Sequence, residues 1–351
     1  MPRRLTIAIP TYNRPEPLRR TLLALRPQAN EDVELVVVDN ASTPPVEPVV
    51  NEVMAGSAWA FRVIRNAANI GMCANILRCF EVANTDWLWA LSDDDAVDPA
   101  AIETILGIVQ KHPELLYATC SIPALPITSD RICESVDAFF QALDSIPRII
   151  FISSSIYHRQ RLIPYLSLAY NFIDSGSPHT ALLQLAGLAQ PQQPMAFLSR
   201  EIASWQPPAP EDTYSKFQAI SQHRLLALSH GATRAHLARL LVKDTPSPVR
   251  LLLHLLRDAA HGRKRELLQT ILTEYFDAYG KTRGGVTGAF WRGPARLAGQ
   301  LALHFAGATK ALAEFAFRLL RGKPLSYDPN PVSLNSYLRL SETKREQTTI
   351  R

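Results

Sequence analysis

Three adjacent carboxylates, Asp93, Asp94 and Asp95, stand directly after a short apolar run of the chain. Neighbouring carboxylates repel each other, so the cluster costs stability unless a positive group or ion binds it. Mg²⁺ and Mn²⁺ prefer oxygen ligands and often join a few carboxylates to the phosphates of a substrate. An exposed acidic turn that caps the next helix is the alternative, but Asp98 is better placed for that role. We therefore predict a Mg²⁺ or Mn²⁺ site in this cluster.

Two other polar segments also follow apolar runs and carry groups that could bind a nucleotide. Residues 10–15 read Pro-Thr-Tyr-Asn-Arg-Pro, and residues 39–42 read Asp-Asn-Ala-Ser. A carboxylate at a strand end, such as that of Asp39, can accept hydrogen bonds from the N–H groups of a nucleobase. An Asx turn that leads the chain away from the strand explains an aspartate there equally well.

These segments fall where alternating strands and helices would bring them together. Short apolar runs rich in β-branched residues predict buried strands at Leu5–Ile9, Leu35–Val38, Phe61–Ile64, Trp87–Leu91, Leu115–Cys120 and Ile149–Ser153. Apolar residues at helical spacing predict helices at Pro15–Leu25, Cys73–Ala83, from an Asp98 cap onwards, and at Pro178–Leu188. Ligands of an open α/β sheet bind at the carboxyl ends of its strands, which is where the polar segments lie.

The chain has 351 residues, of which 47% are hydrophobic and 20% charged, as expected for a packed soluble protein. Its four cysteines form no CxxC pair, which argues against a disulfide framework or a structural zinc site and suits a reducing cytoplasm. No clean apolar stretch reaches the roughly 18 residues of a spanning helix. We therefore expect a cytoplasmic protein.

A change of pattern near Trp205 predicts a domain boundary, with an α/β domain over residues 1–205 and a mainly helical region over 206–351. The segment Lys281–Pro324 holds eight Lys or Arg residues and one acid, Glu314, among apolar residues at helical spacing. Such a helix can lie on an anionic membrane surface, here the inner face of the plasma membrane, or pack on the first domain. Nucleic acid is not an expected partner, because the basic region has no recognised motif.

Four motifs, in their order along the chain, resemble glycosyltransferase family 2. They are Ile9-Pro10-Thr11-Tyr12-Asn13-Arg14, Val36-Val37-Val38-Asp39-Asn40-Ala41-Ser42, Asn69-Ile70-Gly71 with Ala74-Asn75, and Leu91-Ser92-Asp93-Asp94-Asp95. The resemblance covers about residues 5–190. It implies the GT-A fold, a Rossmann-like mixed sheet flanked by helices, and transfer with inversion at the anomeric carbon.

The resemblance also implies a role for each residue of the first two motifs. Thr11 and Tyr12, flanked by Pro10 and Asn13, would hold the nucleobase and ribose, with Tyr12 either stacking on the base or packing on the first helix. Asp39 would accept the N3–H of a pyrimidine, which suits uracil or thymine.

The other two motifs would surround the diphosphate. Asn69 and Asn75 match the segment that lines the diphosphate and sugar, although either could be a turn or cap residue. Asp94 matches the metal-ligating aspartate of the family's DxD motif, with Asp95 as a second candidate ligand. Asp93 would then contact the ribose or the sugar.

The chain departs from the family pattern at two places. Ser92 stands where the DxD motif usually has its first aspartate, and the acidic pair that supplies the general base is missing at the expected helix start. His179 occupies that place, and Asp174 lies in the preceding loop. Glu211-Asp212 imitates the acidic pair but comes later in the chain. We therefore expect Asp174 or His179 to be the base, with Asp212 as a third candidate.

The sequence thus predicts an inverting glycosyltransferase that moves a hexosyl or deoxyhexosyl group from a UDP- or dTDP-sugar to a hydroxyl of a glycan or lipid-linked acceptor. Bacterial surface polysaccharide synthesis is the pathway class that the resemblance implies. A nucleotidyltransferase is one alternative, but it usually has a Gly-rich loop where Thr11-Tyr12-Asn13 stands. The other alternative is an inactive binding protein that keeps the fold.

Overall fold

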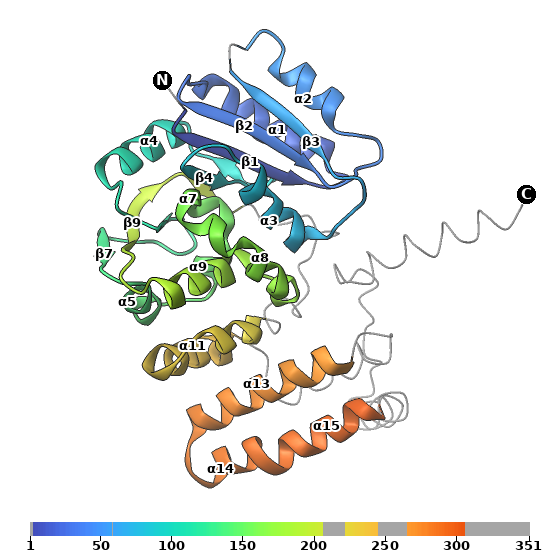
Figure 1. Ribbon diagram of the computed structural model, residues 1–351, viewed down its shortest axis with the longest axis vertical. Helices are drawn as coiled ribbons and strands as arrows, with labels where there is room; N and C mark the ends of the chain where they lie inside the picture. Colours follow the sequence, from blue (N-terminus) through green and yellow to red (C-terminus); the bar gives the residue numbers. More distant parts are fainter. Residues whose placement is uncertain (1–2, 58, 206–221, 245–264, 306–351) are drawn as a thin grey trace, which may run out of the picture. The chain divides into compact units, whose positions relative to one another are not determined.

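The computed structural model describes residues 3–57, 59–205, 222–244 and 265–305. The chain forms two compact units, Met1–Pro207 and Pro208–Arg351. Figure 1 shows a sheet flanked by helices in the first unit and helices in the described part of the second. The predicted α/β class, with a mixed sheet flanked by helices and a helical C-terminal region, is confirmed.

The first unit is built on an eight-stranded mixed sheet. In spatial order its strands are β3 (Phe61–Arg65), β2 (Val33–Asp39), β1 (Leu5–Thr11), β4 (Trp87–Ala90), β8 (Ser155–His158), β6 (Tyr117–Ser121), β9 (Met195–Glu201) and β7 (Arg131–Cys133). The first four run parallel, and β8 pairs antiparallel with both β4 and β6. A second, two-stranded sheet joins β5 (Ala96–Val97) to β10 (Ala203–Ser204).

Helices cover both faces of this sheet (Figure 1). The helices of the first unit are α1 (Pro15–Leu25), α2 (Glu47–Met54), α3 (Met72–Val82), α4 (Ala101–Lys111), α5 (Val136–Ala142), α6 (Pro147–Ile150), α7 (Arg159–Leu162), α8 (Leu166–Ala169) and α9 (Pro178–Ala189). Alternate residues of β1 and β2 point to the same face, because successive side chains of a strand alternate. On one face they join α1, α2 and α4 in a core that includes Leu5, Ile7, Leu22, Val53 and Ile105.

Two predictions about local structure are wrong. The run Ile149–Ser153 is not a strand, because Pro147 begins the short helix α6 and a 3₁₀ turn follows over Ile152–Ser154. The strand β8 starts only at Ser155, where pairing with β4 and β6 becomes available. Asp98 is also not the cap of α4. Its backbone N–H donates to Ile202 O at 3.0 Å, so it lies beside β10, and its carboxylate accepts from the N–H of Ala100, the residue that caps α4.

The second unit is helical throughout its described part. Its elements are the 3₁₀ segment η6 (Gln222–Leu228), α11 (Gly231–Asp244), α13 (Arg265–Arg283), α14 (Gly285–Phe290), the π-helical segment η7 (Trp291–Ala295) and α15 (Arg296–His304). A small core joins Leu268, Leu272, Tyr275 and Phe276 of α13 to Leu303 of α15. Among the helices of the described ranges, none is long and apolar enough to cross a membrane.

Candidate active site

The polar segments predicted to act together meet at one edge of the sheet. β1 lies between β2 and β4 and runs parallel to both, so the carboxyl ends of the three strands are neighbours. Thr11 is the register partner of Asp39, and its hydroxyl donates to Asp93 Oδ2 at 2.6 Å. The Thr11 side chain, predicted to hold a nucleoside, therefore also fixes the orientation of the acidic segment.

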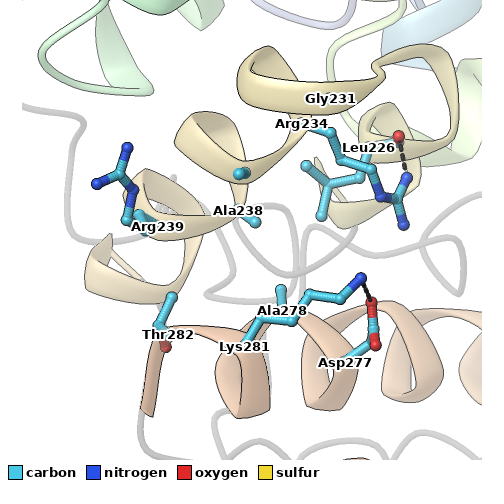
Figure 2. A pocket seen from close by; sticks show the side chains of 10 residues that line it. Leu226, Gly231, Arg234, Ala238, Arg239, Asp277, Ala278, Lys281 and Thr282 are labelled. Atoms are coloured by element: carbon cyan, nitrogen blue, oxygen red, sulfur yellow. Dashed lines mark hydrogen bonds and ion pairs between the residues drawn. The ribbon is translucent and has the colours of Figure 1, made fainter. Parts of the chain in front are cut away.

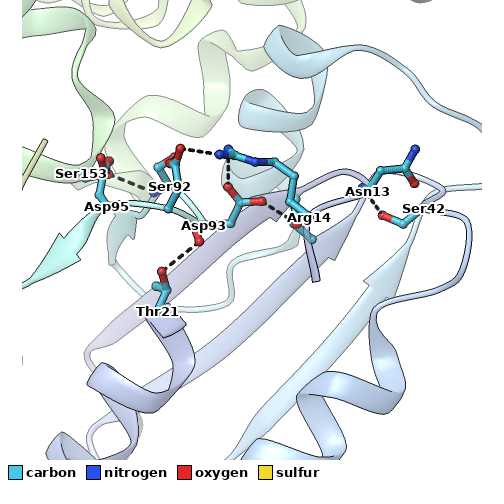
Figure 3. A network of polar contacts seen from close by, with 10 residues as sticks. Asn13, Arg14, Thr21, Ser42, Ser92, Asp93, Asp95 and Ser153 are labelled. Carbon is cyan, nitrogen blue, oxygen red and sulfur yellow. Dashed lines mark hydrogen bonds and ion pairs between the residues drawn. The ribbon is translucent and has the colours of Figure 1, made fainter. Parts of the chain in front are cut away.

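Arg14 joins the acidic segment to the start of α1 (Figure 3). Its Nη1 donates to Asp93 Oδ1 at 2.9 Å and its Nη2 donates to Asp94 Oδ2 at 2.6 Å. The backbone carbonyl of Asp93 also accepts from Thr21 Oγ1 at 2.9 Å. A guanidinium in this position offsets the mutual repulsion of the two carboxylates, which explains how the cluster is tolerated at the strand end.

Asp95 faces a different partner from its two neighbours. Its Oδ2 accepts from Ser153 Oγ at 2.6 Å, and the same hydroxyl oxygen accepts from the Ser92 N–H at 2.9 Å. Ser92 Oγ in turn donates to Asp94 Oδ1 at 2.6 Å. The side chains of Asp93 and Asp94 therefore converge on Arg14, whereas that of Asp95 holds the segment that precedes β8.

Asp39 is almost fully buried, with 1% of its side chain exposed. Its Oδ1 accepts from the Ser42 N–H at 2.9 Å, which closes an Asx turn, and its Oδ2 accepts from Arg65 Nη1. Arg65 Nη2 donates to Ser42 O at 2.8 Å. Asp39 therefore forms the Asx turn that the sequence offered as an alternative, and it has a cation beside it. Its binding of a nucleobase stays a prediction.

A buried amide network continues from Asn40, the residue after Asp39. Asn40 Nδ2 donates to Asn69 Oδ1 at 2.7 Å, and Asn40 Oδ1 accepts from Asn66 Nδ2 at 3.0 Å. Asn75 is 2% exposed, and its amide donates to Val38 O at 3.1 Å and accepts from Asn66 at 2.8 Å. Asn69 and Asn75 therefore brace the loop that leads into α3, and Asn75 faces the protein interior.

The remaining residues of the first motif shape the turn between β1 and α1. Asn13 has a positive φ of 55° and lies exposed. Its N–H donates to Ser42 Oγ at 2.9 Å, and its side-chain oxygen accepts from the Thr43 N–H at 2.7 Å. Pro10 and Tyr12 are half-buried beside it. Asn13 thereby ties the ends of β1 and β2 together.

The two leading candidates for the general base differ in environment. His179 is 1% exposed, and its Nε2 donates to Ile149 O at 3.2 Å. Burial lowers the pKa of His179 to about 4, so the imidazole is a poor proton acceptor with no access to solvent. Asp174 is half-buried in the 3₁₀ segment η4 (Tyr170–Ser175). Glu211 and Asp212 lie outside the described residues.

Asp174 lies near the N-terminus of α3. Burial, and after it the negative charge of Asp174, raises the pKa of the Cys73 thiol to about 12. Cys73 is in the first turn of α3, directly after the loop that Asn69 braces. Of the two candidates, Asp174 is therefore the one that combines partial exposure with proximity to this loop.

Arg14 and Arg65 have no role predicted from the sequence, although both pair with predicted site carboxylates. Arg65 is the register partner of Asp39 on the neighbouring strand, and Arg14 follows the turn after β1. Arg65 directly follows a predicted strand, and Asp39 directly follows the predicted strand before it in the chain. If the two strands pair in parallel, their ends are neighbours, and this could have indicated Arg65 from the sequence. Arg14 depends on the turn geometry, which the sequence does not reveal.

The acidic segment fits a divalent cation that shares its coordination with phosphate. Within the described ranges, the structure contains no group of three His, Cys, Asp or Glu side chains that could hold a metal ion alone. The carboxylates of Asp93 and Asp94 nevertheless converge on one cation, the guanidinium of Arg14. The Asp94 side chain is 15% exposed and that of Asp93 is 4% exposed. Mg²⁺ commonly uses one or two carboxylates together with phosphate oxygens, so the donor set is suitable.

A pocket of about 330 Å³ lies in the second unit, between α11 and α13 (Figure 2). It contains none of the predicted site residues. Its lining includes Lys281, which pairs with Asp277 at 2.7 Å, and Arg234, which pairs with Glu274 at 2.6 Å. The pair of Arg234 with Glu274 joins α11 to α13, whereas the pair of Lys281 with Asp277 lies within α13.

Sequence comparison places the first unit among known transferases. Residues 6–124 match the family described as Glycosyl transferase family 2. Abequosyltransferase RfbV of Salmonella typhimurium is 35% identical over 97 residues, which cover 26% of this chain and 28% of that protein. An uncharacterized glycosyltransferase of Haemophilus influenzae is 31% identical over 113 residues, which cover 32% and 37%. The chain thus spans about a third of the length of these curated relatives.

Structural comparison agrees on the fold. The structure of S. aureus TarS 1-349 in complex with UDP is 16% identical, with a TM-score of 0.51, and the match covers 93% of this chain and 94% of that one. At this identity the likeness concerns the fold alone, which is the GT-A fold predicted from the motifs. Residues 6–124 therefore match glycosyltransferase family 2, and the N-terminal unit that contains them has the GT-A fold.

Proposed function

We propose that the chain is an inverting glycosyltransferase that moves a hexosyl or deoxyhexosyl group from a UDP- or dTDP-sugar to a hydroxyl of a glycan or lipid-linked acceptor. The observation that carries this proposal is the meeting of Asp39, Asp93 and Asp94 at one edge of the sheet, inside the segment that matches the family. The Salmonella relative is named an abequosyltransferase, and S. aureus TarS has been solved with UDP-GlcNAc. Both names support a sugar-nucleotide donor and, with the family, a role in polysaccharide synthesis.

In this proposal the chain's own residues bind and orient the donor. The carboxylate of Asp39 accepts the N3–H of the pyrimidine, and Tyr12 and Thr11 lie beside the nucleoside. Asp94 and Asp93 would hold Mg²⁺ or Mn²⁺, and the ion would supply positive charge for the diphosphate leaving group. Arg14, which pairs with both carboxylates, would compete with the metal for them.

The chemical step forms one bond and breaks one bond. The acceptor oxygen attacks the anomeric carbon on the face opposite the diphosphate, and the bond from that carbon to the diphosphate oxygen breaks. Asp174 accepts the proton that the acceptor hydroxyl loses. A general base contributes typically about 10²–10⁴-fold to such a reaction. His179 is the weaker candidate, because its ring is buried and its pKa is lowered to about 4.

The test is a panel of UDP- and dTDP-sugars incubated with the full chain, an acceptor mixture and Mn²⁺, with the released nucleotide identified by chromatography. Acceptor-dependent release of UDP or dTDP is the expected result, and it should stop in Asp94→Asn. Release of pyrophosphate would instead indicate a nucleotidyltransferase. Donor binding without any turnover across the panel would favour the inactive binding protein.

A further inference from the structure

The helical segment from α14 to α15 has both buried and exposed apolar side chains. Its inner face packs on α13. The Trp291 ring meets Phe276 and Tyr279 edge-on, with ring centroids 5.4 and 5.5 Å apart. Leu303 is fully buried in the same core, and Gln300 Nε2 donates to Thr273 Oγ1 at 3.0 Å. This face therefore accounts for the packing of the segment within its unit.

The outer face of the same segment is also apolar, and it is exposed. Its large side chains are Val286 at 89%, Phe290 at 51%, Leu297 at 58%, Leu301 at 55% and Phe305 at 63% exposure. Val286 and Phe290 are four residues apart on α14, and Leu297, Leu301 and Phe305 follow at intervals of four residues on α15 and its C-cap, so each helix has exposed apolar side chains at helical spacing. We call these five side chains the outer apolar face.

Such a cluster is unusual for the surface of a protein in water. The other exposed large apolar residues of the described ranges are distributed singly over the first unit, at Leu23, Ile70, Ile132, Leu168, Ile173, Leu188 and Trp205. Five lie together on the outer apolar face within 20 residues. Scattered apolar residues need no explanation, whereas a contiguous exposed patch marks an interaction surface.

The charged residues of the segment from α14 to α15 are Arg292 and Arg296, and both are basic. From residue 278 to residue 305 the sequence contains Lys281, Arg283, Arg292 and Arg296 and no aspartate or glutamate. Lys281 pairs with Asp277 and Arg283 lies over the Tyr279 ring at 5.1 Å. Arg292 is exposed, although its side chain lies beside Gly280 of α13 and its Nε donates to Gly288 O at 3.4 Å. Arg296 is half-buried. Apolar side chains bordered by basic ones are typical of helices that lie in the interface of an anionic membrane.

We propose that the outer apolar face docks on an anionic lipid surface, with Phe290, Leu297 and Leu301 entering the headgroup boundary and Arg292 and Arg296 contacting lipid phosphates. The helices of the described ranges are too short or too polar to span a bilayer, which suits a helix lying along it. A second copy of the chain is a poorer occupant. In a two-fold dimer the same face would meet itself, so the basic residues of the two copies would repel each other.

This docking deepens the proposed function, because it would bring the transferase to lipid-linked acceptors, but lipid binding does not depend on catalysis. The experiment is therefore co-sedimentation of the full chain with vesicles, with no donor or acceptor present. Vesicles of phosphatidylcholine alone are compared with vesicles containing 30% phosphatidylglycerol (about a third of the lipid, enough to give a negative surface potential).

The expected result is binding to the anionic vesicles that weakens at high salt, because exposed charges are screened. The double variant Phe290→Gln/Leu297→Gln should weaken binding to the anionic vesicles by about tenfold or more. Arg292→Gln/Arg296→Gln should weaken it by very roughly 25-fold, since each basic residue near such a surface contributes about fivefold. The matched control Leu23→Gln/Leu188→Gln removes two equally exposed apolar side chains from α1 and α9 and should bind like the unchanged chain.

Three results would overturn the inference. The first is that the unchanged chain does not bind the anionic vesicles. The second is that the control variant loses as much vesicle binding as the outer-face variants. The third is that both outer-face variants bind the vesicles like the unchanged chain. A dimer in light scattering that Phe290→Gln/Leu297→Gln converts to monomer, without vesicle binding, would assign the face to self-association. Because the experiment does not measure glycosyl transfer, a lack of vesicle binding would not contradict the proposed function. In the same way, vesicle binding by a chain without transferase activity would still support lipid docking.

Discussion

Arg65 lies directly opposite Asp39 on the neighbouring parallel strand and donates a hydrogen bond to its carboxylate. The carboxylate is 1% exposed, whereas the Arg65 side chain is 41% exposed. The acid is thus held in one orientation by a cation that still reaches solvent. A pyrimidine that approaches this strand end would meet a carboxylate already oriented and partly neutralised.

Asp39→Ala should weaken the binding of UDP or dTDP by very roughly ten- to a hundredfold, because a charged hydrogen bond contributes about 1.5–3 kcal/mol. The protein should stay folded, since Arg65 can be hydrated once its partner is lost. Isothermal calorimetry measures the affinity. Asp32→Ala is the control, because it removes another carboxylate–arginine pair, with Arg4, just before β2 at the other end of that strand. Equal affinities in all three proteins would contradict the assignment.

Asp94→Asn should abolish transfer and remove the Mn²⁺ dependence of donor binding, because an amide is a much weaker ligand for a hard cation than a carboxylate. The melting temperature should change little, since Asp94 keeps a hydrogen-bonding partner in Ser92. Glu103→Gln, on the exposed side of α4, makes the same chemical change away from the site. Full turnover in excess chelator would refute the metal role.

Arg14→Ala should make the stability of the protein depend on metal. Without the guanidinium, the buried carboxylate of Asp93 loses a charged partner, which should lower the free energy of unfolding by about 1–3 kcal/mol. Mn²⁺ should then raise the melting temperature more in this variant than in the unchanged chain, because Arg14 no longer competes for the carboxylates. Arg19→Ala, which removes an exposed pair with Glu52, should show no such gain. An identical response to Mn²⁺ in all three proteins would exclude competition between Arg14 and metal.

The general base is tested by Asp174→Asn, His179→Ala and Asp212→Asn. We expect Asp174→Asn to lower turnover by about 10²–10⁴-fold while donor affinity stays unchanged. His179→Ala should mainly lower the melting temperature, because it removes a buried ring and its bond to Ile149. If Asp174→Asn keeps full turnover, the assignment of Asp174 is wrong, and loss in only one of the other variants identifies the base instead.

The burial of His179 should also make stability depend on pH. Its pKa is lowered to about 4 in the folded protein, from about 6.5 in the unfolded chain. The unfolded chain therefore binds more protons between these values, so the stabilisation is complete above about pH 6.5 and is lost as the pH falls toward 4. The difference corresponds to roughly 3 kcal/mol. Urea unfolding from pH 7 to pH 4.5 should give a shallower pH slope for His179→Gln, and an unchanged slope would mean that another group titrates.

The family resemblance, the fold class and most of the sheet were predictable from the amino-acid sequence. Apolar runs such as Val33–Asp39 are buried over their whole length, and that pattern is visible without any tertiary information. The four motifs also placed the polar segments at strand ends, and parallel strands necessarily gather those ends at one edge. The sequence also predicts that Ile149 and Ile152 are buried, as they are. It does not predict their conformation, because an apolar run does not distinguish a strand from a short helix.

Which side chains face each other was not predictable from the sequence, because it depends on the tertiary structure. Asp93, Asp94 and Asp95 are equivalent letters in the sequence, yet two of them converge on Arg14 and the third on Ser153. His179 stands at the expected helix start, yet the fold buries its ring against Ile149. Side-chain direction depends on the twist of the strand end and on partners far away in the chain. Hydrogen bonds that join residues about 60 to 80 positions apart leave no periodic trace in the sequence.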